Sequence, residues 1–155
     1  MLAAVFEVEF VLNPFNDVGI SLKQILYIVV EEVMDNKYTC AVIGLSDNPD
    51  RYAYKAAKQL LAHDYPVIGY GLRNVNVLGI NVITDKKPVH GVDTVTLYVG
   101  PRHQEAWMPL LLDLKPRRII FNPGTENHEN QLKLEEAGIE VVEACTLVML
   151  SIGTF

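Results

Sequence analysis

The sequence lacks several features that mark specialised classes of protein. It has only two cysteines, Cys40 and Cys145, too few for a disulfide framework, so a reduced, cytoplasmic protein is expected. The net charge is −6, whereas proteins that bind duplex nucleic acid usually carry a basic surplus. The apolar run Ile25–Val30 is far shorter than a bilayer span. The apolar stretch Met1–Leu12 contains two glutamates and no preceding base, which is untypical of a signal peptide. We therefore expect no nucleic-acid or membrane partner.

The composition is that of one globular domain. Hydrophobic residues make up 50% of the 155 positions and charged residues 21%, which excludes a disordered or low-complexity chain. A chain of this length builds one domain with a substantial core, and is too short for two ordinary domains.

The N-terminal part differs from the rest in its charge. Residues 1–34 hold five acidic side chains and a single basic one, Lys23. The apolar spacing within Ser21–Val33 predicts an amphipathic helix with Ser21 as N-cap. We expect residues 1–38 to be an extension preceding a domain at 39–155. It is either a start-site artefact, with Met34 as the true start, or an extra helix packed on the domain.

From Thr39 onward, apolar strand-like segments alternate with helical ones. The helices are predicted at Pro49–His63 with Asn48 as N-cap, at Gln104–Leu114, and at Asn127–Ala137 with Gly138 as the stop. Gly71–Gly91 is expected to be an irregular connection. Strands joined by helices form parallel sheets, so an α/β, three-layer Rossmann-like domain with a mainly parallel five-stranded sheet is predicted. Its strands are Thr39–Gly44, Pro66–Tyr70, Asp93–Val99, Arg117–Phe121 and Ile139–Val142.

Glycines and arginines gather in the loops that follow these strands. In open α/β sheets the ligand binds at the carboxyl ends of the strands. Arg51, Arg73 and Arg102 lie in or just beyond these loops of an otherwise acidic protein, beside a predicted helix N-terminus that also attracts anions. The pattern predicts an anionic, nucleotide-like ligand. Glycines that allow close backbone approach occur in four of the loops: Gly44, Gly71, Gly100 and Gly124.

The loops narrow the choice of nucleotide. The first loop has Gly44, Ser46 and Pro49 where a dinucleotide fingerprint has glycines, and the chain contains no P-loop sequence. An NAD site has an acid after the second strand, but here Gly71-Leu72-Arg73 follows. Because an arginine suits a phosphorylated ribose, NADP and coenzyme A, with its 3′-phosphate, remain.

The stretch AVIGLSDNPDRYAYKAAKQLLAHDYPVIGY resembles the opening of the small single-domain coenzyme A-binding proteins, which are similar to the N-terminal domain of the succinyl-CoA synthetase α subunit. The likeness extends from about Thr39 to Thr146. It departs at Tyr70-Gly71-Leu72, where the family often has Val-Asn-Pro, and at Val99-Gly100-Pro101, where it often has two arginines. The first motif matches at Gly44, Ser46, Pro49, Arg51, Tyr54, His63, Tyr65 and Val67.

The resemblance implies that coenzyme A, or an acyl-CoA, lies across the strand ends. Gly44, Ser46 and Arg51 would hold phosphates, and Pro101 and Gly124 would line the pantetheine side. Taken together, the loop pattern and the resemblance predict twelve binding residues: Gly44, Ser46, Asn48, Arg51, Tyr54, Gly71, Arg73, Gly100, Pro101, Arg102, Gly124 and Thr125.

No arrangement of residues indicates catalysis or a metal site. The sequence after Gly44 does not form a nucleophile elbow, and the four histidines lack metal-ligand spacing. Cys145 either faces the thiol end of a bound coenzyme A or is a small buried residue. We therefore expect a monomeric or homodimeric module that binds coenzyme A without chemistry of its own. The alternatives are an NADP-binding reductase or regulatory domain, and an interaction subunit with a degenerate pocket.

Overall fold

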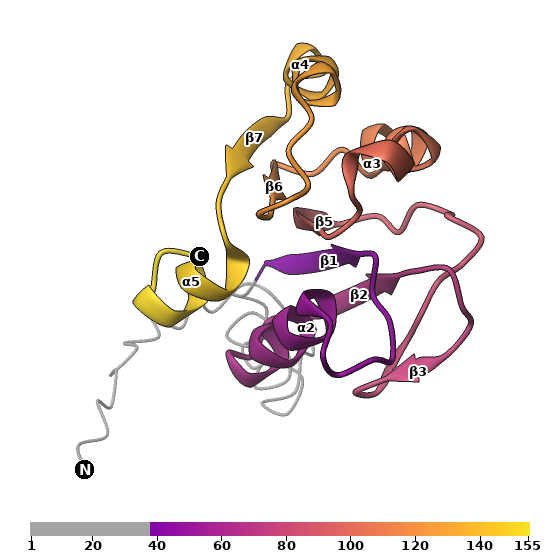
Figure 1. The fold of residues 1–155 in the computed structure, drawn as a ribbon, viewed down its shortest axis with the longest axis vertical. Helices are drawn as coiled ribbons and strands as arrows, with labels where there is room; N and C mark the ends of the chain where they lie inside the picture. The colour runs from indigo at the N-terminus through magenta and orange to yellow at the C-terminus, as the bar shows by residue number, and fades with distance from the viewer. Residues whose placement is uncertain (1–37) are drawn as a thin grey trace, which may run out of the picture. The chain divides into compact units, whose positions relative to one another are not determined.

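The computed structural model describes residues 38–155, which belong to one compact unit (Figure 1). The helix predicted at Ser21–Val33, and the extension to which it was assigned, lie outside the described residues. No helix within residues 38–155 is long and apolar enough to cross a membrane.

Five parallel strands form the central sheet. They are β1 (Thr39–Ile43), β2 (Val67–Tyr70), β5 (Val92–Leu97), β6 (Arg118–Phe121) and β7 (Glu140–Glu143). Their order is β2-β1-β5-β6-β7, and every neighbouring pair is parallel. The predicted Rossmann-like α/β fold is confirmed, and each predicted strand is present with its ends shifted by no more than two residues.

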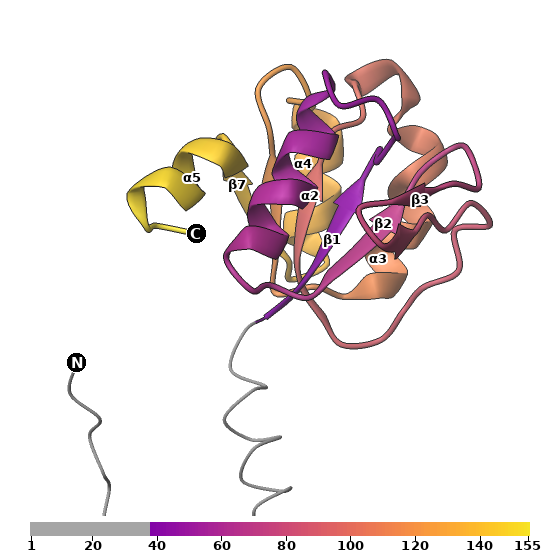
Figure 2. The same cartoon turned by 90° about the horizontal axis from the view of Figure 1, so that it is seen from below.

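Helices cover both faces of the sheet (Figures 1 and 2). On one face, α2 (Tyr52–Ala62) and α5 (Thr146–Ile152) contribute Leu60 and Leu150 to one apolar cluster. On the other face, α3 (Met108–Leu114) and α4 (His128–Glu136) pack into a second cluster. The interior strand β1 contributes side chains to both clusters, which explains why its sequence is almost wholly apolar.

The first helix begins later than the sequence predicts. Asn48 does not cap a helix that starts at Pro49. Its Oδ1 accepts a hydrogen bond from the Asp50 N–H at 2.9 Å, and its carbonyl accepts one from the Arg51 N–H at 3.1 Å. This Asx turn uses the asparagine that was expected to cap the helix. Arg51 occupies the N-cap position, without a side-chain hydrogen bond.

The helix predicted at Gln104–Leu114 is broken into shorter pieces. Two 3₁₀ turns, η1 (Pro101–His103) and η2 (Glu105–Trp107), precede α3. The buried Gln104 side chain donates from Nε2 to Val99 O at 2.9 Å and to Thr125 O at 2.5 Å. Gln104 therefore ties the loop after β5 to the loop after β6.

The end of α4 follows the prediction closely. Gly138 has a φ of 81°, and its N–H donates to Glu135 O while the Ile139 N–H donates to Leu134 O. These two bonds make the Schellman ending that glycine favours. At the start of the same helix, Asn127 Oδ1 accepts from the Asn130 N–H at 3.3 Å, which confirms the predicted beginning.

Two short strands and one α-helix were not predicted. The irregular connection contains a short antiparallel hairpin of β3 (Asn76–Val77) and β4 (Ile80–Asn81). Its two turn residues, Leu78 and Gly79, both have positive φ. Helix α5 follows the last predicted strand, in a part of the sequence for which no element was predicted.

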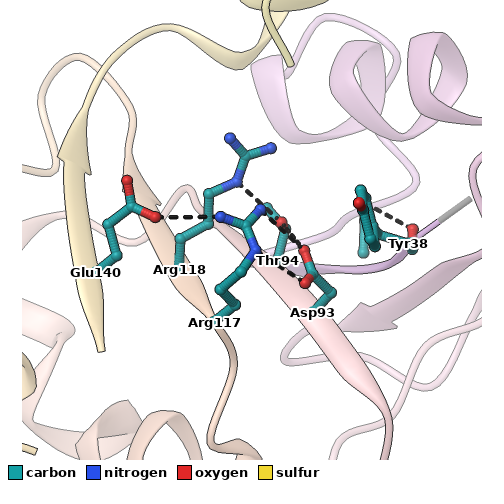
Figure 3. A network of polar contacts seen from close by, with 7 residues as sticks. Tyr38, Asp93, Thr94, Arg117, Arg118 and Glu140 are labelled. Atoms are coloured by element: carbon teal, nitrogen blue, oxygen red, sulfur yellow. Dashed lines mark hydrogen bonds and ion pairs between the residues drawn. The ribbon is translucent and has the colours of Figure 1, made fainter. Parts of the chain in front are cut away.

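A polar network closes the amino ends of three strands (Figure 3). The Arg117 guanidinium donates to both carboxylate oxygens of Asp93, at 3.1 and 3.3 Å, and to Glu140 Oε2 at 3.2 Å. Beside it, Arg118 Nε donates to Thr94 Oγ1 at 3.0 Å. The network lies at the end of the sheet opposite to the loops that the sequence assigns to ligand binding, and its role is to hold β5, β6 and β7 together.

Candidate functional site: a cleft at the carboxyl ends of the strands

A cleft of about 1210 Å³ lies where the loops after β1, β2, β5 and β6 meet. The order of the strands reverses between β1 and β5, and ligands of open α/β sheets bind outside this switch point. The volume exceeds the range of roughly 300–1,000 Å³ that is usual for small-molecule pockets. The cleft therefore suits a large, extended ligand.

Most of the residues predicted from the sequence meet at this cleft. Tyr54, Gly71 and Pro101 are not among its lining. Tyr54 packs against the apolar cluster under α2. Gly71 is buried where a Cβ would lie 2.3 Å from Leu45 O, so its glycine serves the close packing of two loops. The predicted residues that line the cleft are Gly44, Ser46, Asn48, Arg51, Arg73, Gly100, Arg102, Gly124 and Thr125.

The glycines of the lining leave room for a ligand. A Cβ added at Gly100 or at Gly124 would meet no protein atom within 4 Å. Gly124 also has a φ of +87°, and Gly44 a φ of +96°, a conformation that other residues adopt only under strain. A Cβ at Gly44 would lie 3.1 Å from Tyr98 O. The loops after β1, β5 and β6 thus expose backbone to the cleft.

The lining is strongly cationic for so acidic a protein. Arg51, Arg73, Lys86 and Arg102 line the cleft, against Glu105 as the acidic member of the lining. Among residues 38–155, no ion pair is formed by Arg51 or Arg102. Such a surface attracts anions.

The start of α2 adds donors to this positive surface. Tyr52 and Ala53 line the cleft in the first turn of the helix. N–H groups of a first turn have no acceptor within the helix, and the helix dipole favours negative charge beside them. By contrast, the N–H groups of Gly44 and Leu45 both donate to Tyr70 O, at 2.9 and 2.8 Å. The N–H groups of Gly44 and Leu45 are therefore already used within the protein, whereas those of the helix start can serve a ligand.

Sequence reasoning missed Lys86 and Trp107. Lys86 Nζ lies 4.5 Å from the centre of the Trp107 ring and donates to Ala106 O at 2.8 Å. Lys86 belongs to the segment that the sequence showed only as an irregular connection, so no motif identified it. Two exposed apolar side chains, Tyr52 and Leu72, also line the cleft.

Beneath the β5 and β6 loops lies a buried polar group of Thr96, Asn122 and Thr146. Asn122 bridges the two threonines: its Nδ2 donates to Thr96 Oγ1 at 2.8 Å, and its Oδ1 accepts from the Thr146 N–H at 2.8 Å. The two threonine hydroxyls also form a hydrogen bond, at 2.7 Å. Thr96 and Thr146 neighbour the buried Tyr98 hydroxyl, but no described residue meets it in hydrogen-bond geometry. Burial raises the pKa of Tyr98 to about 12, so the phenol stays protonated near neutral pH.

The two cysteines have different surroundings. Cys40 is fully buried in β1, and desolvation raises its pKa to about 12. Cys145 is half-buried at the N-cap of α5 and is not part of the cleft lining. Within residues 38–155, no three or more histidine, cysteine, aspartate or glutamate side chains are grouped to hold a metal ion.

This chain matches one protein family and is similar to several proteins of known structure. Residues 38–151 match the profile of a family described as "CoA binding domain". A crystal structure of a protein described only as uncharacterized has 45% sequence identity, covers 78% of this chain and 100% of its own, and superposes with a TM-score of 0.75.

Two further relatives are more distant. YneT of Bacillus subtilis (strain 168) is 24% identical over 114 residues, which are 73% of this chain and 84% of that protein. A structure from Thermus thermophilus, cell-free ID.343, shares the fold, with 23% identity, coverage of 83% of this chain and 98% of that one, and a TM-score of 0.69.

Proposed function

The chain belongs to the CoA-binding domain family, and from this membership we propose that its strand-end cleft binds coenzyme A or an acyl-CoA and catalyses no reaction itself. The observation that carries the proposal is the position of the cationic cleft at the switch point of the sheet. In this family of folds, that is where a nucleotide is held.

The chemistry of the lining fits the phosphates of such a ligand. The first turn of α2 presents N–H groups, and Arg51 stands at its N-cap. Helix starts of this kind are ready anion sites, and a guanidinium binds phosphate through two parallel hydrogen bonds. We assign the pyrophosphate of coenzyme A to this corner, with Ser46 beside it.

The other half of the cleft fits the pantetheine arm. Gly100 and Gly124 leave space free of protein atoms beside the ends of β5 and β6, and Val99 and Pro123 add apolar surface there. A slender, largely neutral chain suits such a channel. Gln104 supports both loops from below through its hydrogen bonds to Val99 O and Thr125 O.

The proposal of binding without catalysis is supported by Tyr98, a titratable side chain of the cleft lining. Burial raises its pKa to about 12, so the phenol is not ionised near neutral pH and is not prepared to act as a base.

A nicotinamide nucleotide with a phosphorylated ribose is the second candidate. The observation in its favour is that β2 is followed by Arg73 rather than by the acid that holds an unmodified ribose. NADP shares the pyrophosphate and a ribose phosphate with coenzyme A, and differs in carrying a second nucleoside in place of pantetheine.

Thermal unfolding and calorimetry with the full chain test the proposal. Coenzyme A at about 100 times its Kd should raise the free energy of unfolding by roughly 2.7 kcal/mol, visible as a higher Tm. A larger shift with NADP would favour the second candidate. If neither ligand raises Tm or gives a binding isotherm, the proposal is wrong, and an interaction subunit with a degenerate pocket becomes the better account.

A further inference from the structure

We propose that Lys86 binds the phosphate on the ribose of the nucleotide, the role that the sequence alone gives to Arg73. The inference rests on the proposed function, because it presupposes a nucleotide in the cleft. Lys86 lies outside every motif found in the sequence. If it has this role, the affinity for the ribose phosphate depends on its ammonium group.

The backbone brings Lys86 to the end of β2. Tyr70 is the last residue of that strand, and its ring is buried. Its hydroxyl donates to Lys87 O at 3.0 Å and accepts from the Val89 N–H at 3.1 Å. Ile83 is also bridged to Tyr70. The segment 85–89 is therefore tied, through this hydroxyl, to the last residue of the strand whose carboxyl end carries the ribose-recognising residue in dinucleotide-binding folds.

The ammonium group of Lys86 contacts uncharged groups of the protein. It donates to Ala106 O at 2.8 Å and lies over the Trp107 ring at 4.5 Å, and among residues 38–155 it forms no ion pair with a carboxylate. An ammonium has three donors, and one goes to Ala106 O. Charge and donors thus remain for an anion in the cleft, on a side chain whose position is already set.

Arg73 is less suited to the same task. It forms an ion pair with Asp47 of the loop after β1, and 65% of its side chain is exposed. A phosphate that binds Arg73 must displace this carboxylate or lie beside its negative charge. A phosphate that binds Lys86 displaces no carboxylate.

Lys86 also stands apart from the corner assigned to the pyrophosphate. Helix α2 packs on one face of the sheet. Trp107, on which Lys86 rests, belongs to the apolar cluster on the opposite face. The two cationic regions therefore approach the cleft from opposite sides, so that separate phosphates of one ligand can occupy them.

The test compares coenzyme A with dephospho-CoA, which lacks only the ribose phosphate. Calorimetry with the full-length Lys86→Met variant should show an affinity for coenzyme A lowered about ten-fold or more, the size of one hydrogen bond between charged groups. Its affinity for dephospho-CoA should change by less than about two-fold. Methionine keeps the apolar stem over Trp107, and the Tm of the free variant reports whether the fold is intact.

Lys87→Met is the matched control, because Lys87 is the next residue, is exposed and does not line the cleft. Its affinity for both ligands should equal that of the wild type. Tyr70→Phe removes the hydroxyl that holds the segment, and should lower affinity for coenzyme A more than for dephospho-CoA, by less than Lys86→Met does.

Several results would overturn the inference. Equal losses for both ligands in Lys86→Met would mean that Lys86 supports another part of the site. Unchanged affinity for coenzyme A would remove Lys86 from the site. Loss of the preference for coenzyme A in Arg73→Gln alone would return the role to Arg73. Wild-type protein that binds both ligands equally contradicts this inference only, whereas wild-type protein that binds neither contradicts the proposed function itself.

Discussion

The two thiols of this chain differ in their burial. Cys40 is fully buried, with a pKa raised to about 12, whereas Cys145 is half-buried. Because the thiolate is the reactive form, we expect a disulfide-exchange reagent to modify Cys145 in the folded protein and to leave Cys40 untouched. The number of thiols titrated before and after denaturation measures this. Loss of the fast-reacting thiol in Cys145→Ser identifies it, and a second fast thiol in that variant would contradict the prediction.

Arg51 is the side chain on which the pyrophosphate assignment can be tested. Its replacement by alanine should lower the affinity for coenzyme A about ten-fold or more, since a hydrogen bond to a charged group is worth about 1.5–3 kcal/mol. The free energy of unfolding should change little, because Arg51 is exposed and forms no side-chain cap. Calorimetry and denaturant unfolding give the two values.

Lys58→Ala serves as the control for Arg51→Ala. Lys58 is an exposed cation on the same helix and lies outside the cleft lining. It removes the same charge from α2, so equal losses of affinity in the two variants would indicate a general electrostatic effect and not a contact at the helix start.

The site residues that could be predicted from the sequence are those that directly follow a predicted strand. Gly44, Gly100 and Gly124 follow strands that the apolar pattern locates, and parallel strands bring their carboxyl ends to one edge. Tyr54 packs against the apolar cluster under α2 and is not in the cleft lining, and the loop pattern does not determine which way a residue of the following helix faces. Lys86 had no signal, because a hydrogen bond from a distant tyrosine hydroxyl holds its segment in place.

At the scale of elements, a helix end was predicted correctly where hydrogen bonds within its own turn determine it. Gly138 ends α4 through hydrogen bonds within its own turn, and a glycine in the sequence is enough to predict such an ending. The start of α2 depends on a competition between two uses of Asn48, as a turn former and as a cap. Helix α5 was missed because apolar Val148 and Ile152 remain exposed, so its sequence shows no amphipathic pattern.

The network at the amino ends of β5, β6 and β7 predicts a pH dependence of stability. Burial of Asp93 raises its pKa, but hydrogen bonds from Arg117 and Thr94 outweigh this and lower the pKa below the ordinary 3.8. A lowered pKa in the folded state stabilises the fold above the unfolded-state pKa, and this stabilisation is lost as the pH falls toward the folded-state value.

Asp93→Asn should therefore be less stable than the wild type at neutral pH, by about 1 kcal/mol. The difference should shrink as the pH is lowered from about 5 to about 3. Denaturant unfolding of both proteins across that range measures it. A gap that stays constant with pH would show that the charge of Asp93 does not contribute, and that only its packing matters.

At the scale of the whole chain, the boundary of the domain is open to experiment. The family match begins at residue 38, and residues 39–143 already contain all five strands of the sheet. We predict that a protein beginning at Met34 folds and binds coenzyme A as the full chain does. Denaturant midpoints and calorimetry on both forms provide the comparison.

If residues before Met34 belong to the fold, removing them should cost a large part of its free energy of unfolding. If Leu22, Ile25, Leu26 and Val29 cover an apolar surface of the domain, their burial contributes at most roughly 6–12 kcal/mol, before the entropy of ordering the segment is subtracted. That rivals the total stability of a small domain. A truncated protein that is insoluble, or whose midpoint falls steeply, would show that the N-terminal residues are integral to the fold.

The parallel pairing of β1 with β5 also determines when the cleft can form. Thr39 pairs with Val92, so the centre of the sheet joins segments that leave the ribosome far apart in time. Contacts of this range fold more slowly than local ones. The last loop of the cleft, at Thr125, is synthesised only after β6. The site proposed for coenzyme A is therefore complete only after most of the chain has been synthesised.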